Sequence, residues 1–223
     1  MNHIAAPPRS RERRKAATRQ ALLQAGRTVF VRDGYQRASL DRVAAEAGFT
    51  KGAVYGNFAT KADLFLAIYE QRSAARAELI AGAAAASSDV EDLRRRMVAD
   101  WRHVDERERG WSLLLIEFWV HAAREPKLRA RLRKAHMEIR EAITAALETV
   151  AKRDGTKLPM PAAKLATAVM ALGNGLNLEA FLDDSLADEL YDTGTSLLGG
   201  TASGAGGGRS RPAGGRRSRG ARA

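Results

Sequence analysis

Residues 39–58 read SLDRVAAEAGFTKGAVYGNF, and this stretch decides how the chain folds. Its apolar residues recur at helical spacing, with Ser39 placed to cap a helix over residues 40–47 and Thr50 placed to cap another over residues 51–58. A glycine-centred turn of about three residues separates the two helices. This spacing is typical of a helix-turn-helix, which places its second helix in the major groove of DNA. Short helix pairs with a glycine turn also occur in helical proteins that bind no DNA.

The flanking sequence shows the helical period almost everywhere and lacks the alternation that is typical of strands. Thr60 with Asp63, and Ser88 with Glu91, have the spacing of capping boxes that open helices. Residues 111–123 are apolar on nearly every side, which predicts a central helix surrounded by others. We therefore expect an all-α fold with helices over about residues 11–32, 40–47, 51–58, 61–80, 90–104, 111–123, 127–152 and 162–183, and a short amphipathic piece over residues 186–198.

The composition excludes several classes of protein. The 223 residues include no cysteine, so a disulfide-stapled miniprotein and a thiolate metal site are both excluded. The N-terminus has no apolar signal-peptide core, and we expect no stretch that approaches the roughly 18 apolar residues of a membrane span. These features predict a cytoplasmic protein that has no membrane partner.

Positive charge is distributed unevenly along the chain. The formal net charge of +11 divides into +8 over residues 1–62, −3 over residues 63–198 and +6 over residues 199–223. An excess of basic residues in the first quarter is expected of a nucleic-acid-binding module, although a basic N-terminus can also be only a solubilising arm. The last segment consists mainly of Gly, Ala, Ser and Arg without a hydrophobic anchor, which predicts a disordered basic tail.

The second helix of the pair has residues that suit contact with DNA. Tyr55 and Asn57 can donate hydrogen bonds to phosphates, and Lys61 stands at a helix N-terminus, where its charge adds to the exposed N–H groups. Lys51 could instead be an ordinary solvated lysine, and Tyr55 an interior aromatic residue. Small or polar residues at the leading end let the backbone enter the major groove: Thr50, Lys51, Gly52 and Ala53.

The continuous run AGRTVFVRDGYQRASLDRVAAEAGFTKGAVYGNFATKADLFLAIYE resembles the TetR family of bacterial transcriptional regulators. The resemblance extends over about residues 19–72, roughly a quarter of the chain. It implies an N-terminal three-helix domain that contains the helix-turn-helix. This domain would be joined through a fourth helix to a larger helical domain for ligand binding and dimerisation.

The resemblance also implies which residues meet DNA. Contacts to the phosphate backbone fall on Ser39, Arg42, Tyr55, Asn57 and Lys61, and the segment Thr50, Lys51, Gly52 and Ala53 matches the one that meets base edges and adjacent phosphates. Two positions depart from the family pattern. Gly56 stands where an aromatic residue is common, and Asn57 stands where His or Tyr is frequent. The preferred DNA sequence cannot be inherited from the resemblance.

An aromatic cluster in the second half of the chain is the candidate ligand pocket. All three tryptophans lie within nineteen residues of sequence. Apolar walls with a few convergent polar groups are typical of small-molecule sites, and an ordinary aromatic core is the alternative. The candidate pocket residues are Met97, Trp101, Trp111, Glu117, Phe118, His121, Asn174 and Asn177.

Operator binding predicts how the chain is divided and assembled. Paired DNA half-sites require a two-fold partner, so the helices over residues 127–152 and 162–183 are candidates for a dimeric four-helix bundle, with packing inside one chain as the alternative. We expect a disordered arm over residues 1–10, a helix-turn-helix DNA-binding domain over 11–62, a helical ligand-binding and dimerisation domain over 63–198, and a disordered Gly- and Arg-rich tail over 199–223.

The function predicted from these features is that of a sequence-specific transcriptional regulator in a bacterial cytoplasm, located at the nucleoid when bound to DNA. As a homodimer it would repress from a palindromic double-stranded operator and be released by a small-molecule effector. The alternative is an architectural protein whose basic ends bind DNA without sequence preference. An enzyme is not expected, because the four histidines show no metal-ligand spacing and we find no catalytic constellation, metal site or cofactor motif.

Overall fold

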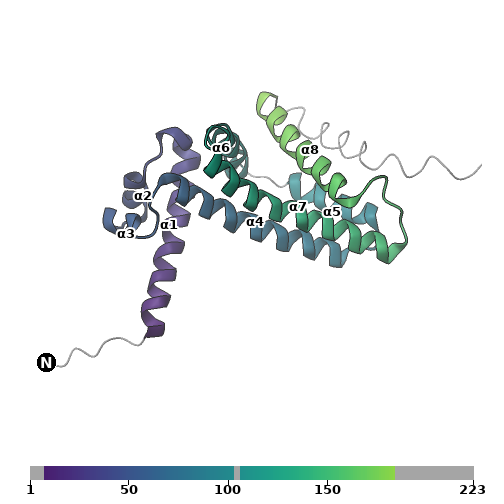
Figure 1. Cartoon of the computed structure of the whole chain (residues 1–223), viewed down its shortest axis with the longest axis horizontal. Coiled ribbons are helices and arrows are strands. Elements are labelled where there is room, and N and C mark those ends of the chain that lie inside the picture. The colour runs from purple at the N-terminus through teal and green to yellow at the C-terminus, as the bar shows by residue number, and fades with distance from the viewer. Residues whose placement is uncertain (1–7, 103–105, 184–223) are drawn as a thin grey trace, which may run out of the picture.

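The computed structural model describes residues 8–102 and 106–183, and every regular element in these ranges is an α-helix. The helices are α1 (Pro8–Arg37), α2 (Leu40–Ala47), α3 (Lys51–Tyr55), α4 (Lys61–Ala86), α5 (Val90–Arg102), α6 (Glu106–Ala123), α7 (Pro126–Asp154) and α8 (Ala162–Leu182). Figure 1 shows α1–α3 at one end of an elongated molecule, with α4 running from them into the bundle of α5–α8. The predicted all-α fold is confirmed.

The first helix is longer than predicted and contains a break near its end. The sequence predicts a stop at Gly34, but α1 continues across this residue to Arg37. Gly34 has φ 75° and ψ 162°, a conformation that L side chains rarely adopt and that interrupts the regular helix. The position of the stop is therefore correct, whereas the last turn after it was not predicted.

Two hydrophobic clusters hold the helices together. The first lies where α1–α4 meet α6 and the N-terminal half of α7, and it is rich in aromatic rings. Phe65 and Phe118 stack at its centre, with ring centroids 3.9 Å apart. The second cluster joins the C-terminal halves of α4 and α7 to α5 and α8. Because α4 and α7 contribute to both clusters, they connect the two ends of the molecule.

Two expectations about α5 and α6 are wrong. At the start of α5 the carboxylate of Asp89, rather than the Ser88 hydroxyl, accepts a hydrogen bond from a first-turn N–H, at 2.7 Å. Asp89 immediately precedes the helix and so has the better position for a cap. In α6 Phe118 is fully buried, but Leu113 is 41% and Val120 55% exposed. One side of α6 therefore faces solvent in the single chain instead of being surrounded.

The last described helix also differs from expectation. By length and composition α8 is apolar enough to cross a membrane, whereas we expected no such stretch. Its buried side includes Leu165, which belongs to the hydrophobic cluster shared with α7, and Leu176. On the other side Leu178 is 43% and Leu182 82% exposed. An apolar helix with one covered and one uncovered side suits a helix–helix interface, so its composition alone is weak support for a membrane span.

Three sequence predictions concern residues that the structure does not describe. The expected arm over residues 1–10 overlaps α1, because that helix begins at Pro8. Residues 1–7, the amphipathic piece over 186–198 and the tail over 199–223 lie outside the described ranges.

Candidate nucleic-acid interface and ligand pocket

Side-chain caps begin both α2 and α3. Ser39 Oγ accepts a hydrogen bond from the N–H of Arg42, and Thr50 Oγ1 accepts one from the N–H of Ala53, both at 3.3 Å. Gly48 ends α2 in the left-handed conformation, with φ 68°. Helices this short gain little from internal hydrogen bonds, so the caps and the core contacts hold them in place. The predicted turn and both predicted caps are confirmed.

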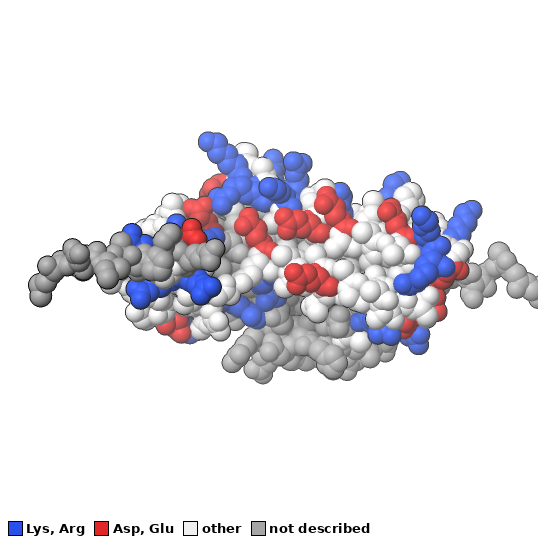
Figure 2. All heavy atoms as spheres, turned by 90° about the horizontal axis from the view of Figure 1, so that it is seen from below, with Lys and Arg blue, Asp and Glu red and all other residues white. Residues whose placement is uncertain are grey.

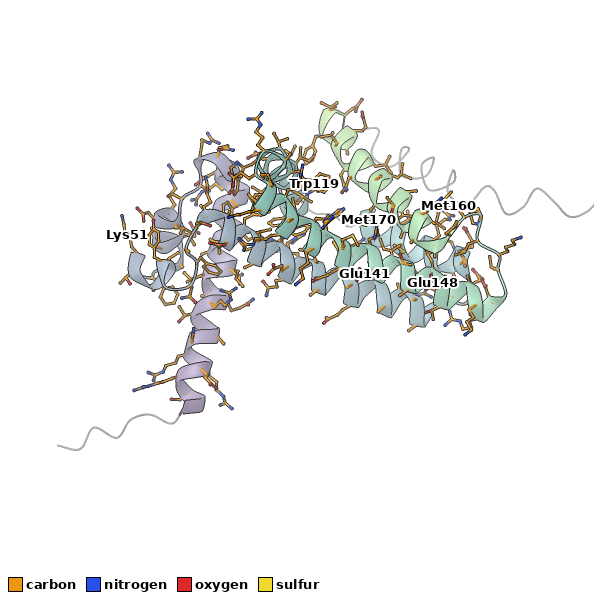
Figure 3. The ribbon with its side chains drawn as sticks, in the orientation of Figure 1. Lys51, Trp119, Glu141, Glu148, Met160 and Met170 are labelled. Carbon is orange, nitrogen blue, oxygen red and sulfur yellow. The ribbon has the colours of Figure 1, made fainter. Side chains whose placement is uncertain are left out.

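The third helix is anchored on one side and open on the other. Val54 is 0% and Phe58 2% exposed, whereas Tyr55 is 53% exposed. Figure 3 shows Lys51 at the end of the molecule that lies farthest from α7 and α8. The predicted base-reading segment therefore lies on the surface, with Thr50, Lys51 and Gly52 exposed and Ala53 half-buried.

Two of the predicted DNA-contacting cations form exposed ion pairs in this structure. Lys51 Nζ lies 2.6 Å from Asp41 Oδ2, and Arg42 lies 2.9 Å from Asp33 Oδ2. Hydrogen bonds from Arg32 and Arg42 lower the pKa of Asp33 to about 2. Solvent screens ion pairs at the surface, so exchanging a carboxylate for a DNA phosphate costs little.

Asn57 and Lys61 are engaged with the backbone instead of projecting freely. Asn57 Nδ2 donates to the Ala53 carbonyl at 2.8 Å. Lys61 Nζ donates to the carbonyls of Tyr35 at 2.8 Å and Gln36 at 3.0 Å, and its partial burial lowers the pKa of its ammonium. An ammonium has three N–H donors, so Lys61 retains one for a phosphate. Both side chains therefore stabilise the fold through these hydrogen bonds, a role that the sequence pattern did not indicate.

Charge is mixed on the face that Figure 2 shows and does not form a single basic patch there. Figure 2 shows Lys and Arg interspersed with Asp and Glu over the face that is seen from below. The first turns of α1 are more uniform, because the exposed residues 11–15 comprise four basic side chains and one acidic one. Arg19 lies over the ring of Phe58, 4.5 Å from its centroid, which places the first half of α1 beside the end of α3.

A cavity of about 210 Å³ lies among α4–α8 and contains half of the predicted pocket residues. Met97, Trp111, Asn174 and Asn177 line it, although they come from three different helices. Sites between the helices of a bundle are a common location for small ligands. The remaining walls are apolar side chains and several polar groups that include no carboxylate among the described lining residues.

The other predicted pocket residues lie elsewhere. Phe118 is fully buried in the first hydrophobic cluster. Glu117 Oε2 accepts a hydrogen bond from the N–H of Tyr35, and the His121 ring lies against the Tyr35 ring with centroids 5.1 Å apart. Glu117 and His121 occupy a different face of α6 from Trp111, whereas Phe118 follows Trp111 by seven residues and stacks with it on Phe65 of α4. The side chain of Trp101 lies outside the described residues.

Sequence reasoning missed a polar pair inside the cavity. The hydroxyl of Tyr69 and Nδ1 of His136 are 2.8 Å apart, and both residues line the cavity. Burial raises the pKa of Tyr69 to about 12 and lowers that of His136, which Arg140 lowers further. The signal in the sequence was weak, because each residue interrupts an otherwise apolar helical stripe.

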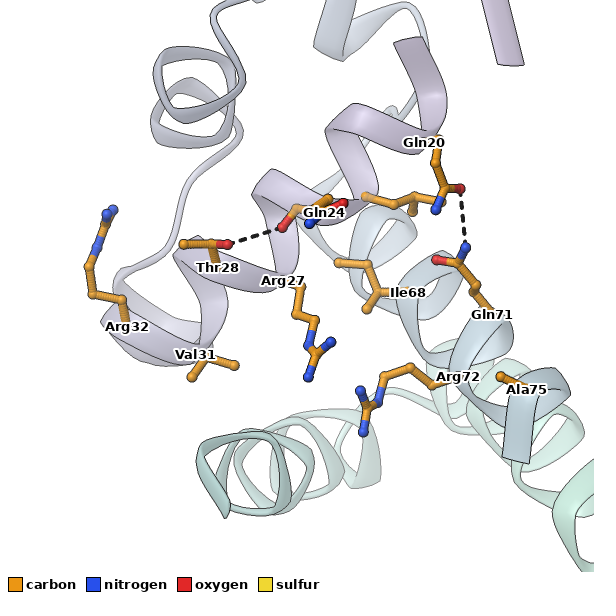
Figure 4. Close-up of a pocket in the computed structure, with 11 residues that line it drawn as sticks. Gln20, Gln24, Arg27, Thr28, Val31, Arg32, Ile68, Gln71, Arg72 and Ala75 are labelled. Atoms are coloured by element: carbon orange, nitrogen blue, oxygen red, sulfur yellow. Dashed lines mark hydrogen bonds between the residues drawn. The ribbon is translucent and has the colours of Figure 1, made fainter. Parts of the chain in front are cut away.

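A second depression is an open groove between α1 and α4, with a volume of about 770 Å³. Figure 4 shows Arg27 and Arg72 directed into it and the Gln20–Gln71 hydrogen bond across it, which measures 3.1 Å. None of the predicted pocket residues lines this groove. It lies between the first helix and the connecting helix, and Arg72 lines both this groove and the cavity among α4–α8.

Comparison with known proteins decides the family. Residues 22–68 match the family model described as bacterial regulatory proteins of the tetR family, and residues 89–193 match the one described as the C-terminal part of BetI-type transcriptional repressors. The chain belongs to the TetR family. The two matches cover the helix-turn-helix and most of the helices around the cavity, so both parts of the resemblance seen in the sequence are confirmed.

Individual relatives agree with this assignment. The transcriptional repressor AcnR of Corynebacterium efficiens is 24% identical over 144 residues, which cover 65% of this chain and 71% of the relative. The transcriptional activator FasR of Mycolicibacterium smegmatis is 28% identical, with coverages of 69% and 68%. The solved SmeT–triclosan complex is 24% identical, covers 81% of this chain and 91% of its own, and has a TM-score of 0.63. That likeness supports the TetR fold.

Family membership confirms the prediction of a DNA-binding transcriptional regulator and does not favour the architectural alternative. TetR regulators are typically not enzymes. Among residues 8–102 and 106–183, no group of three or more His, Asp or Glu side chains is placed to hold a metal ion.

Proposed function

We propose that this TetR-family chain is a repressor that leaves a palindromic operator when a small molecule enters the cavity among α4–α8. The single observation that carries the proposal is that α4, which is separated from the exposed recognition helix α3 only by residues 56–60, also lines the cavity of about 210 Å³. The match of residues 89–193 to BetI-type repressors and the repressor AcnR support this sign of regulation, while the SmeT–triclosan complex is a relative that holds a small molecule.

In this proposal the DNA contacts are divided by type. Thr50, Lys51, Gly52 and Ala53 meet base edges and nearby phosphates from the exposed start of α3. The phosphate backbone is held by the second group: Ser39, Arg42, Tyr55, Asn57 and Lys61. The described start of α1 adds basic side chains beside the same end of the molecule.

The exposed apolar side of α8 supports a homodimer. Leu178 and Leu182 leave apolar surface uncovered in the single chain, next to the long helix α7. If α7 and α8 of a second copy packed against α7 and α8 of the first, this surface would be covered. The resulting dimer would present two recognition helices, one for each half-site of the operator. We also propose that the DNA-binding domain meets the ligand-binding and dimerisation domain at residues 62 and 63, and that the dimer acts in the cytoplasm, at the nucleoid when it is bound to DNA.

Selection of bound duplexes from a random DNA pool tests the proposal. The full chain and a chain truncated after Gly199 would each be used at low and near-physiological salt. A shared palindrome is expected from both chains, because base reading is assigned to α3 and not to the tail. Binding without an enriched sequence, lost on removal of the tail, would instead support the architectural alternative.

A further inference from the structure

We propose that Glu117 positions the DNA-binding helices by clamping the last turn of α1 to α6. This inference rests on the proposed function, since α6 also lines the cavity assigned to the effector. The clamp would make the orientation of α3 depend on where α6 lies. It gives Glu117 a positioning role in DNA binding, in place of the ligand contact expected from the sequence.

The clamp begins where α1 is broken. Gly34 has a positive φ, and a Cβ added to it would lie 3.2 Å from both carboxylate oxygens of Glu117. The next N–H, that of Tyr35, donates to Glu117 Oε2 at 2.8 Å across 82 residues of sequence. A break in a helix leaves a backbone N–H that needs another acceptor, and the carboxylate supplies one. The glycine thus allows both the break and the close approach of α6.

Tyr35 is held from the other directions as well. Its carbonyl accepts a hydrogen bond from Lys61 Nζ, and the same ammonium lies 4.6 Å from the centroid of its ring. The ring is 2% exposed and meets Phe118 of α6 edge to face, with centroids 5.0 Å apart. Phe65 of α4 makes a similar contact at 5.7 Å. One residue therefore connects α1, the first turn of α4, and α6.

The position of this residue determines where the recognition helix lies. Only Gln36 to Ser39 separate Tyr35 from the start of α2, and α2 packs directly on α3. Because this connecting segment is so short, a displacement of the end of α1 also displaces the helix-turn-helix. The recognition helices of a dimer must match two successive major grooves, so a small rotation at this point changes the affinity for DNA.

Different sides of α6 face the cavity and the end of α1, so α6 can couple ligand binding to the clamp. Trp111, Ser112 and Leu115 line the cavity, whereas Glu117 is turned toward the end of α1. A molecule that shifts α6 on entering the cavity moves the clamp with it. Glu117 is itself exposed, so its carboxylate is readily solvated when the hydrogen bond opens. A contact that can open at low cost is suited to reversible control.

The absence of cysteine allows a direct test of the geometry. Ala45→Cys on α2 and Glu148→Cys on α7, both exposed positions, give two unique sites for spin labels. Labelled protein diluted with unlabelled protein reports the distance within one chain. We would compare the labelled parent with Glu117→Ala, with Glu117→Gln, which keeps an oxygen acceptor, and with the control Glu141→Ala on the exposed side of α7.

Glu117→Ala is expected to broaden or shift the distance distribution and to weaken binding to the selected operator by roughly five- to tenfold, at the low end of couplings between sites. Glu117→Gln and Glu141→Ala should stay close to the parent. Glu117→Asp keeps the charge on a side chain that is one methylene shorter, so it should resemble Glu117→Ala. It replaces Glu117→Ala in the comparison if that variant folds poorly.

Two outcomes would overturn the clamp. One is an unchanged distance distribution in Glu117→Ala, even if its unfolding midpoint falls, because that would show a stabilising role alone. The other is a shift of equal size in Glu141→Ala. Failure to select any operator would count against the proposed function, while the distance measurement would still decide on the clamp.

Discussion

Replacing Lys61 with alanine separates its role in the fold from its predicted role in DNA binding. The ammonium donates two hydrogen bonds to carbonyls of α1 and lies over the Tyr35 ring. Hydrogen bonds that involve a charged group are worth about 1.5–3 kcal/mol each, and an exposed cation–π contact about 0.5–1 kcal/mol. Water can replace the bond to the exposed Gln36, and release from partial burial offsets part of the loss.

We therefore expect Lys61→Ala to lower the free energy of unfolding by about 2–3 kcal/mol, and Tm by about 5–10 °C. Urea unfolding followed by circular dichroism measures this change, with Lys127→Ala as the control at an exposed lysine of α7. A loss below about 0.5 kcal/mol, the range of ordinary surface substitutions, would refute the reasoning about the fold.

The same variant tests the phosphate contact through a different observable. Loss of one phosphate contact should reduce the slope of log K against log salt by about 0.9 in magnitude. A destabilised variant with an unchanged slope would show that Lys61 supports α1 without touching DNA. A reduced slope with unchanged stability would show the reverse, so the two roles can be told apart.

Three further predictions concern separate parts of the chain. Replacing Arg13 and Arg14 with Gln should reduce the salt slope by up to about two for any duplex, and an unchanged slope would place the start of α1 away from DNA. His136 has a pKa below its ordinary 6.5, because burial disfavours its charged form. The unfolded chain therefore binds the proton more readily, so the stability from neutral His136 is present above about pH 6.5 and declines as the pH falls below it. His136→Gln should lose less free energy of unfolding than the parent between about pH 7.5 and 5.5, and equal losses in urea titrations would contradict this. Leu178→Glu with Leu182→Glu should yield monomers in light scattering and weaken binding to a palindrome on the order of 100-fold, whereas an intact dimer would place the interface elsewhere.

The helix-turn-helix could be predicted in detail because its signals are local. The hydroxyls of Ser39 and Thr50 and the left-handed Gly48 act within a few residues of their own position. The apolar residues Val54 and Phe58 follow the helical spacing of this stretch and are buried. Such features depend on the backbone of one short segment, so the order of residues is enough to specify them.

The pocket was predicted only in part because its members come from five helices. Periodicity shows that Trp111 and Phe118 are apolar residues of one helix, but not that the first lines a cavity while the second meets the Tyr35 ring of α1. Glu117 and His121 are polar residues on an apolar helix, which suggested a ligand site. Their partner is the end of α1, a neighbour that no sequence spacing identifies.

The sequence by itself thus determined the all-α class, the helix-turn-helix with its caps, and the TetR resemblance. Tertiary structure alone decided that Lys61 supports the end of α1, that Tyr69 meets His136 inside the cavity, and that Glu117 faces Tyr35. The physical reason is the range of the interactions. Caps and helical periods are set by neighbours along the chain, whereas these contacts depend on how helices separated by tens of residues rotate and pack against one another.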